Sequence, residues 1–227
     1  MLNPSLWVIG AEGDKEDDTM QTRTEKGGKN SEGPIGTGLV IERRFTTVGE
    51  DPFDQFDWIE MDVEIRNADG SLAHRIDDVR LPSGFSGVAG KVLAQKYLRK
   101  AGVPAILRKV KEKGVPTWLQ RSEPDHEKLQ SLDPEKRFIG ESHGRELFRR
   151  LAGTWTYWGW KHGYFEAEAD ARAYFDEMCY LIASQRSAPN SPQWFNTGLH
   201  WAYGIEGPAQ GHRYIDPSTG ELMTSTN

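Results

Sequence analysis

Polar side chains suited to binding an anion gather in one short stretch, residues 186–198. Asn190, Ser191 and Gln193 offer hydroxyl and amide groups there, and together with backbone N–H groups they can surround an anion without a fixed positive charge. Two prolines in the stretch rule out a continuing helix, because proline lacks an amide donor and favours extended geometry in its predecessor. We therefore expect a loop that binds a ligand.

The same stretch has a simpler interpretation as an ordinary connection. Trp194 and Phe195 bring apolar area that would hold a connecting loop against a core. Composition alone favours this second interpretation. A binding role needs support from the elements that position the loop, or from a wider pattern in the sequence.

A strongly amphipathic segment, residues 167–185, leads into the loop. Its apolar side chains recur at helical spacing, at Ala171, Phe175, Met178 and Ile182. Acidic residues occupy the first turn, where the helix dipole favours negative charge. Cys179 lies beside the apolar stripe, so we expect it to act as a small buried hydrophobic residue rather than a redox thiol.

Earlier in the chain the pattern predicts a β-hairpin and then a helix. Residues 58–65 alternate apolar and charged side chains, and a polar turn separates them from residues 72–76, which can return as the partner strand. A helix is expected over residues 88–97. Its expected buried face consists of Val88, Val92, Leu93 and Tyr97.

The remaining segments are shorter or irregular. A short helix is expected over residues 142–151, with Gly153 as its stop. Residues 115–140 hold many prolines, glycines and charges and are expected to form a connector on the surface. Residues 200–204 and 207–212 are expected to form loops.

Three clusters of similar residues each have a functional and a structural interpretation. Basic residues crowd residues 91–113, where a solvated helix face is favoured over a phosphate or nucleic-acid contact because no aromatic platform accompanies the charges. Aromatic residues crowd residues 155–165, where packing is favoured over stacking on bases. Acidic residues crowd residues 50–57, where a solvated strand entry is favoured over a metal site.

Composition narrows the classes of function. The 227 residues include 34 acidic and 28 basic side chains, and the net charge of −6 indicates no general attraction to nucleic acid or to an anionic membrane. One cysteine excludes an internal disulfide framework and fits a reducing compartment. No apolar run is long enough to span a bilayer. We expect a cytoplasmic protein that does not insert into a membrane.

Residues 151–164, 188–205 and 207–212 resemble one family closely. Their dense pattern of Trp, Tyr and Gly around an Asn-Ser-Pro sequence is similar to the N-terminal part of the adenosylcobalamin-dependent (class II) ribonucleotide reductases, in their long bacterial form. Residues 94–97 and 100–104 also fit. The resemblance covers the chain from about residue 41 to its end.

The resemblance implies an α+β fold, mostly helical with a small β-hairpin, that leads into a ten-stranded α/β barrel absent from this chain. It implies a thiyl-radical enzyme that removes the 2′-hydroxyl of a ribonucleotide. Adenosylcobalamin would generate the radical, and a thioredoxin-like protein would supply the electrons. Asn190, Ser191 and Gln193 would contact the substrate near its phosphate, although related reductases often have a hydroxyl residue in place of Gln193.

The resemblance also divides the chain into regions. Residues 1–40 are expected to be a disordered leader, in which Met20 is an alternative start. Residues 41–83 form the hairpin region and residues 84–185 the helical N-terminal region of the reductase. Residues 186–227 form the substrate-site loop and the start of the catalytic barrel.

The cysteine count departs from the family. Such a reductase needs a radical cysteine and a redox-active pair, whereas this chain has Cys179 alone. We expect a truncated N-terminal piece that is inactive by itself and depends on the remainder of the reductase chain. Two other classes stay open, namely a non-catalytic nucleotide-binding or interaction module and a binder of single-stranded nucleic acid.

Overall fold

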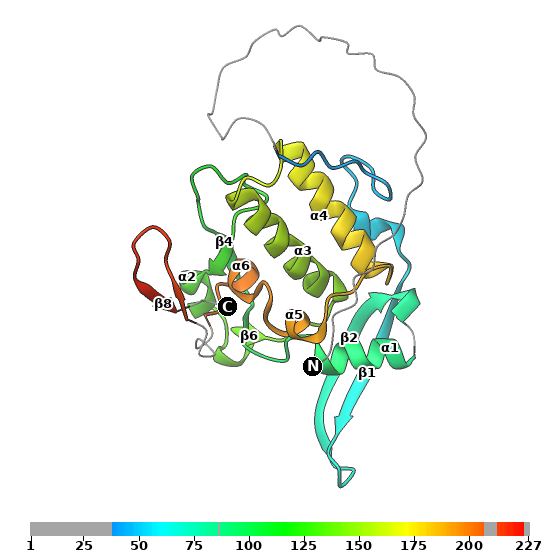
Figure 1. Cartoon of the computed structure of the whole chain (residues 1–227). Coiled ribbons are helices and arrows are strands. Elements are labelled where there is room, and N and C mark those ends of the chain that lie inside the picture. The colour runs from blue at the N-terminus through cyan, green and yellow to red at the C-terminus, as the bar shows by residue number, and fades with distance from the viewer. Residues whose placement is uncertain (1–37, 86, 207–212, 225–227) are drawn as a thin grey trace, which may run out of the picture. The chain divides into compact units, whose positions relative to one another are not determined.

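Two helices packed side by side form the centre of the fold (Figure 1). The computed structural model describes residues 38–85, 87–206 and 213–224. The two helices are α3 (Gly144–Lys161) and α4 (Glu168–Ala183). Their inward side chains belong to one buried core and include Leu147, Phe148, Leu151, Phe175, Cys179 and Ile182. The amphipathic helix and the buried position of its cysteine are confirmed.

Helix α3 is longer than the sequence predicts, because Gly153 does not end it. This glycine faces Trp201 of α6 (Leu199–Tyr203), and a Cβ atom at position 153 would lie 2.1 Å from the indole ring. Glycine is therefore required for the close approach of the two helices. The helix continues through most of the aromatic cluster, residues 155–165.

The aromatic cluster packs only in part, so the favoured interpretation holds for some of its residues. Trp158 and Tyr164 are 50% and 60% exposed, whereas the other four aromatic side chains are half-buried: Trp155, Tyr157, Trp160 and Phe165. The Tyr157 hydroxyl donates a hydrogen bond to the Glu112 carboxylate at 2.6 Å, and the Trp160 indole donates to the Gly114 carbonyl, also at 2.6 Å. Burial and the neighbouring Glu112 carboxylate together raise the pKa of Tyr157 to about 12. These bonds attach the C-terminal half of α3 to the 112–114 turn.

A capping box starts α3. The Nδ1 atom of His143 accepts the backbone N–H of Arg145 at 3.1 Å, and the Glu146 carboxylate accepts the backbone N–H of His143 at 3.1 Å. Burial lowers the pKa of His143, and the charges of Arg145, Arg80 and Arg149 lower it further. Neutral His143 is the form that can accept this hydrogen bond.

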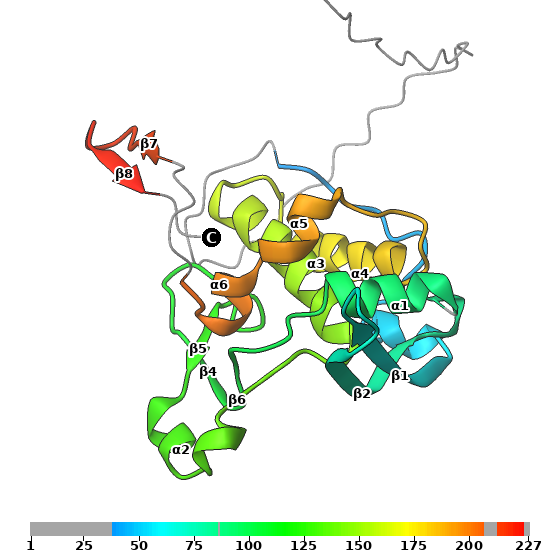
Figure 2. The same cartoon turned by 90° about the horizontal axis from the view of Figure 1, so that it is seen from below.

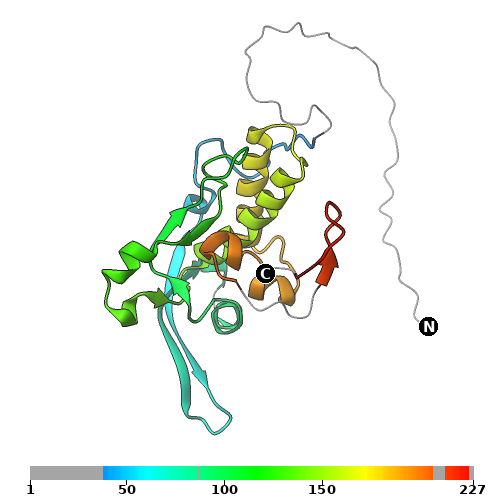
Figure 3. The ribbon, with the colours of Figure 1, turned by 90° about the vertical axis from the view of Figure 1, so that its left-hand side faces the viewer.

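The β-hairpin expected from the alternating pattern is confirmed. Strand β1 (Trp58–Arg66) pairs antiparallel with β2 (Leu72–Pro82), which is longer than predicted. Two register shifts interrupt the ladder, so the alternation of inward and outward side chains is not continuous. Val63, Val79 and Leu81 are buried where the hairpin meets the helices. Its far end extends away from them (Figure 3).

Helix α1 (Val88–Lys96) is confirmed, but the predicted buried face is wrong in part. Val88 and Val92 are exposed, at 77% and 37% of their surface, whereas Leu93 and Ala94 are buried. The reason is Gly90, whose missing side chain lets the helix approach Phe85 and the hairpin closely. The tertiary contact therefore rotates the packed face away from the one that apolar residues alone suggest.

Residues 115–140, expected to be a plain connector, instead contain short strands that pair with strands just before this segment. Strand β3 (Val103–Pro104) pairs with β6 (Phe138–Ile139), and β4 (Leu107–Lys109) pairs with β5 (Ser122–Pro124). The described chain also contains the short helical elements η1 (Pro52–Gln55), η2 (Ser83–Phe85), α2 (His126–Gln130) and η3 (Pro134–Lys136). Every pairing in these sheets is antiparallel.

The described residues therefore form a mixed α/β structure of several helices and small antiparallel sheets, which agrees with the expected α+β class. A last hairpin joins β7 (Arg213–Ile215) and β8 (Leu222–Thr224). Most of the predicted leader lies in residues 1–37, which are outside the described residues. The expected loop at 207–212 also lies outside them. Within the described chain, no helix combines the length and the apolar character that crossing a bilayer requires.

We expect Gly153→Ala to destabilise the protein by about 1–3 kcal/mol, because the added methyl group displaces the Trp201 ring. In a Trp201→Leu background the same change should stabilise, since alanine favours a helix over glycine by about 1 kcal/mol. Urea unfolding of the four proteins gives the coupling energy. Equal effects of Gly153→Ala in the two backgrounds would contradict the contact.

The His143 cap should make stability depend on pH. Because the folded-state pKa of His143 is lowered, the unfolded chain takes up the proton first as the pH falls below about 6.5, and the free energy of unfolding decreases. His143→Asn keeps a capping side chain that does not titrate. Urea unfolding between pH 7.5 and pH 5 should show a smaller loss in this variant, while Glu146 titrates in both proteins. Parallel pH profiles would refute the cap's contribution.

Candidate functional site

The stretch expected to be a binding loop contains a short helix, so that prediction is wrong for part of it. Residues 184–190 are irregular, but α5 (Ser191–Asn196) follows and α6 comes directly after it. Pro192 occupies the first turn of α5, where the missing amide hydrogen costs nothing. Pro192 thus permits a new helix to begin after the irregular segment.

The predicted site residues lie together at the start of α5, and all three are exposed. Asn190 immediately precedes the helix, and its carbonyl accepts the backbone N–H of Gln193 at 3.1 Å. The Ser191 hydroxyl lies 3.0 Å from the hydroxyl of Tyr97, at the end of α1. The structure therefore presents an amide, a hydroxyl and a second amide on one exposed turn.

Trp194 fixes α5 to the protein. Its indole donates a hydrogen bond to the Pro189 carbonyl at 2.8 Å, and its ring stacks on Tyr97 with centroids 5.5 Å apart. The ring also meets the edge of Phe148 in α3. The anchoring role expected for this tryptophan is confirmed, and it holds the exposed turn in place.

A fully buried ion pair holds the other end of α5. The Nε atom of Arg150, in α3, lies 2.9 Å from a carboxylate oxygen of Glu141. The remaining guanidinium nitrogens donate to the carbonyls of Thr197 at 2.5 Å and Trp194 at 3.3 Å. These carbonyls lie where a short helix leaves backbone acceptors open, so the arginine satisfies them without water.

Glu141 gathers further donors around the same centre. Its carboxylate accepts the backbone N–H of Arg99 at 2.8 Å and the hydroxyl of Tyr203 at 2.7 Å. Burial raises the pKa of Tyr203, and the adjacent carboxylate raises it further, so the hydroxyl stays protonated and donates. One carboxylate therefore connects the segment after α1, helix α3 and helix α6.

A glycine allows the turn between α5 and α6 to approach α3. Gly198 has a φ of 86°, in the left-handed region, and a Cβ atom there would lie 2.4 Å from the Arg150 carbonyl oxygen. Any side chain would therefore collide with the α3 backbone. The position explains why α5 and α6 can both pack on one helix.

A hollow of about 360 Å³ lies between the end of α1 and α5. Figure 2 shows where these two helices lie. Basic, aromatic and polar side chains line the hollow: Lys96, Tyr97, Arg99, Lys100, Phe195 and Asn196. It lies beside the exposed turn because Tyr97 both lines it and contacts Ser191. The candidate site thus combines the α5 turn with part of the basic cluster.

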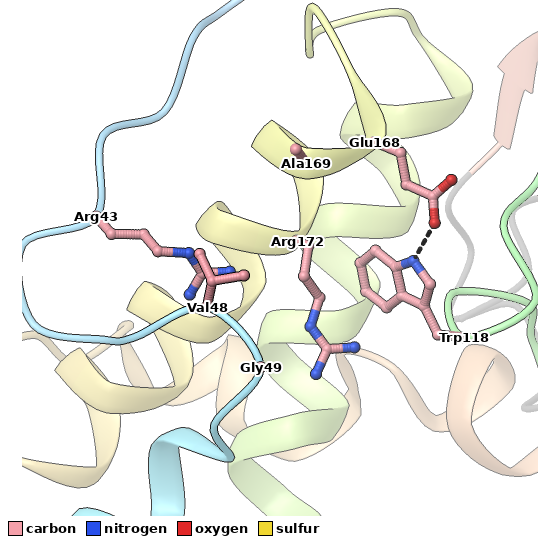
Figure 4. A pocket seen from close by; sticks show the side chains of 7 residues that line it. All are labelled: Arg43, Val48, Gly49, Trp118, Glu168, Ala169 and Arg172. Atoms are coloured by element: carbon pink, nitrogen blue, oxygen red, sulfur yellow. Dashed lines mark hydrogen bonds between the residues drawn. The ribbon is translucent and has the colours of Figure 1, made fainter.

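A second hollow, of about 520 Å³, lies near the start of α4 (Figure 4). Its charged groups are already paired. Arg43 and Arg172 both bind the buried Asp176, and the Trp118 indole donates to Glu168 at 2.9 Å. This hollow offers few free groups to a ligand, so we do not place the functional site there.

The described residues contain no group of three His, Cys, Asp or Glu side chains that would hold a metal ion. The acidic cluster at residues 50–57 is used structurally instead, since Asp51 caps η1 and pairs with Arg149. Burial raises the pKa of the Cys179 thiol well above its ordinary value. In the described chain this thiol is therefore a packed group.

A family model described as class II vitamin B12-dependent ribonucleotide reductase matches residues 60–185. The chain belongs to this family. It is 56% identical over 187 residues to the vitamin B12-dependent ribonucleotide reductase of Bradyrhizobium diazoefficiens and 55% identical over 187 residues to that of Agrobacterium fabrum. A more distant relative in Streptomyces avermitilis, with the same name, is 30% identical over 173 residues.

The class II match covers only part of each relative. The first two alignments take in 82% of this chain but 15% of each relative, and the Streptomyces avermitilis alignment takes in 75% and 14%. The chain thus spans about 15% of the length of these two curated reductases. The family model ends before α5 begins.

Sequence reasoning found the α5 residues and their Trp194 anchor, but missed the Arg150–Glu141 pair and the contact of Tyr97 with Ser191. Arg150 lies between Phe148 and Leu151 in the apolar stripe of α3, and this placement is a signal of a buried arginine. Neither Glu141 nor the contact of Tyr97 with Ser191 leaves a comparable signal, because both depend on residues far away in the chain.

Breaking the buried pair should be costly. We expect Arg150→Met to lower the free energy of unfolding by about 3–5 kcal/mol, because it leaves the Glu141 carboxylate buried without its cation. Arg80→Met is the matched control, since Arg80 pairs with Glu60 on the surface, and it should cost less than about 1 kcal/mol. Adding Glu141→Gln to Arg150→Met should recover part of the loss. Similar urea unfolding curves for the two single variants would contradict this account.

Proposed function

We propose that the protein forms the N-terminal part of an enzyme that reduces ribonucleotides to 2′-deoxyribonucleotides for DNA synthesis, and that α5 belongs to its substrate site. Family membership supports the reaction class. The observation that carries the site is a short helix that is anchored at both ends and leaves Asn190, Ser191 and Gln193 exposed together. These groups bind the substrate near its phosphate.

Each α5 side chain has a chemical role in this proposal. The Ser191 hydroxyl donates to a phosphate oxygen while Tyr97 holds it from the other side at 3.0 Å. The side-chain amides of Asn190 and Gln193 donate to further oxygens of the same group. Because Trp194 and Arg150 immobilise the helix, little ordering entropy is lost when the substrate binds.

Radical chemistry and the cofactor belong to the rest of the reductase. Adenosylcobalamin would supply the radical in the whole enzyme. Cys179 is packed in the core of the described chain, so its thiol is not available to carry that radical. In the overall reaction the C2′–O bond breaks, water leaves, and two cysteine thiols elsewhere become a disulfide that a thioredoxin-like partner reduces.

The regional division follows from the same proposal. We assign residues 84–185 to the helical N-terminal region and residues 186–227 to the segment that enters the ten-stranded catalytic barrel. We place the enzyme in the cytoplasm, because a free thiol such as Cys179 fits a reducing compartment. Its partners are the ribonucleotide, the reductant and the remainder of the reductase chain.

The test is a chimera in which this chain replaces the matching 187 residues of the Bradyrhizobium diazoefficiens reductase. Ser191→Ala in the chimera should lower kcat/KM at least about tenfold, because a hydrogen bond to a charged phosphate is lost. Ser187→Ala is the control, since this exposed serine precedes the site, and it should leave kcat/KM unchanged. A chimera that folds but does not reduce ribonucleotides would contradict the function, and equal effects of the two variants would contradict the site.

A further inference from the structure

Two long stretches without acidic residues meet at the hollow between α1 and α5. The chain carries a net charge of −6, yet it has no Asp or Glu between Asp78 and Glu112, and none between Glu177 and Glu206. The first stretch supplies α1 and its C-terminal end, and the second supplies α5. Folding therefore brings together two segments that each lack negative charge.

Three cations line this hollow without a carboxylate partner. Lys96, Arg99 and Lys100 take part in none of the ion pairs found among the described residues. Glu141 accepts the backbone N–H of Arg99, but its charge is balanced by Arg150. The positive charge at the hollow is therefore not neutralised within the described chain.

The other lining residues suit a nucleotide better than a simple ion. Phe195 is 44% exposed and lies beside Tyr97 with ring centroids 5.3 Å apart, so an aromatic surface borders the cations. Asn196 adds an amide. The hydroxyl pair of Tyr97 and Ser191 connects this hollow with the exposed turn of α5.

We propose that Lys96, Arg99 and Lys100 form a polyphosphate site that binds the phosphate chain of the ribonucleotide held at α5. The inference rests on the proposed function, which places the substrate at this helix. Lysine and arginine side chains form charge-assisted hydrogen bonds with phosphate oxygens, and these bonds strengthen as the number of phosphate charges rises. The sequence favoured a solvated helix face for the basic cluster. For these three residues we propose a phosphate contact instead.

The site predicts affinities that follow the number of phosphates. A ribonucleoside triphosphate should bind more tightly than a diphosphate, and a diphosphate more tightly than a monophosphate. Binding should weaken as salt concentration rises, because the interaction is largely electrostatic. Inorganic tripolyphosphate should compete, since the contacts are with phosphate oxygens and not with the base.

The experiment uses two triple variants with the same change in charge. The test variant is Lys96→Gln/Arg99→Gln/Lys100→Gln, and the matched control is Lys91→Gln/Lys111→Gln/Lys113→Gln, which removes exposed cations of the same basic cluster outside this hollow. In the chimeric reductase, the test variant should raise KM for the ribonucleotide at least about tenfold and change kcat less than about twofold. The control should stay within about twofold of the unsubstituted chimera.

The outcomes separate this inference from the proposed function. Unchanged KM in the test variant, with a raised KM in Ser191→Ala, would overturn the polyphosphate site and leave the function standing. Equal shifts in both triple variants would overturn it as well, because they indicate a general charge effect. If the chimera is inactive, calorimetric titration of the 227-residue chain with a ribonucleoside triphosphate decides. A loss of at least about tenfold in triphosphate affinity in the test variant, but not in the control, supports the site. The site is overturned if the unsubstituted chain does not bind the triphosphate, or if it binds a single-stranded oligonucleotide more tightly.

Discussion

The buried ion pair of Arg150 and Glu141 is the interaction on which the rest of this structure depends. Two full charges removed from water are tolerated only when further hydrogen bonds satisfy them, and here the chain provides four. The donors and acceptors come from α5, α6 and the segment after α1. A single centre therefore fixes the positions of three elements that have little regular structure of their own.

Such a centre suits a site built from short elements. Helices of five or six residues are marginal in isolation, because the cost of starting a helix exceeds the gain from so few hydrogen bonds. Arg150 and Trp194 replace the missing intrinsic stability with tertiary contacts. The exposed polar turn at Ser191 is thus attached directly to the core, as the proposed substrate site requires.

Close backbone approach is the second constraint. Gly153 lies within α3, and Gly198 packs against it. At either position a Cβ atom would collide with a neighbouring group. The same principle applies at Gly90, where α1 meets the hairpin. Glycine thus has a packing role where α1 meets the hairpin, where α6 meets α3 and where the turn between α5 and α6 meets α3.

The sequence by itself determined the α4 helix, the β-hairpin, the buried Cys179 and the class II reductase family, because each depends on local periodicity or on a long continuous pattern. It also located the polar residues of the candidate site. Only the tertiary structure decided that Gly153 continues a helix, that Ser191 begins one, and that Lys96 lies near Phe195. The first and third outcomes depend on contacts between residues far apart in the chain, and local sequence carries no signal of such contacts. Pro192 permits a helix start at Ser191 but does not by itself require one.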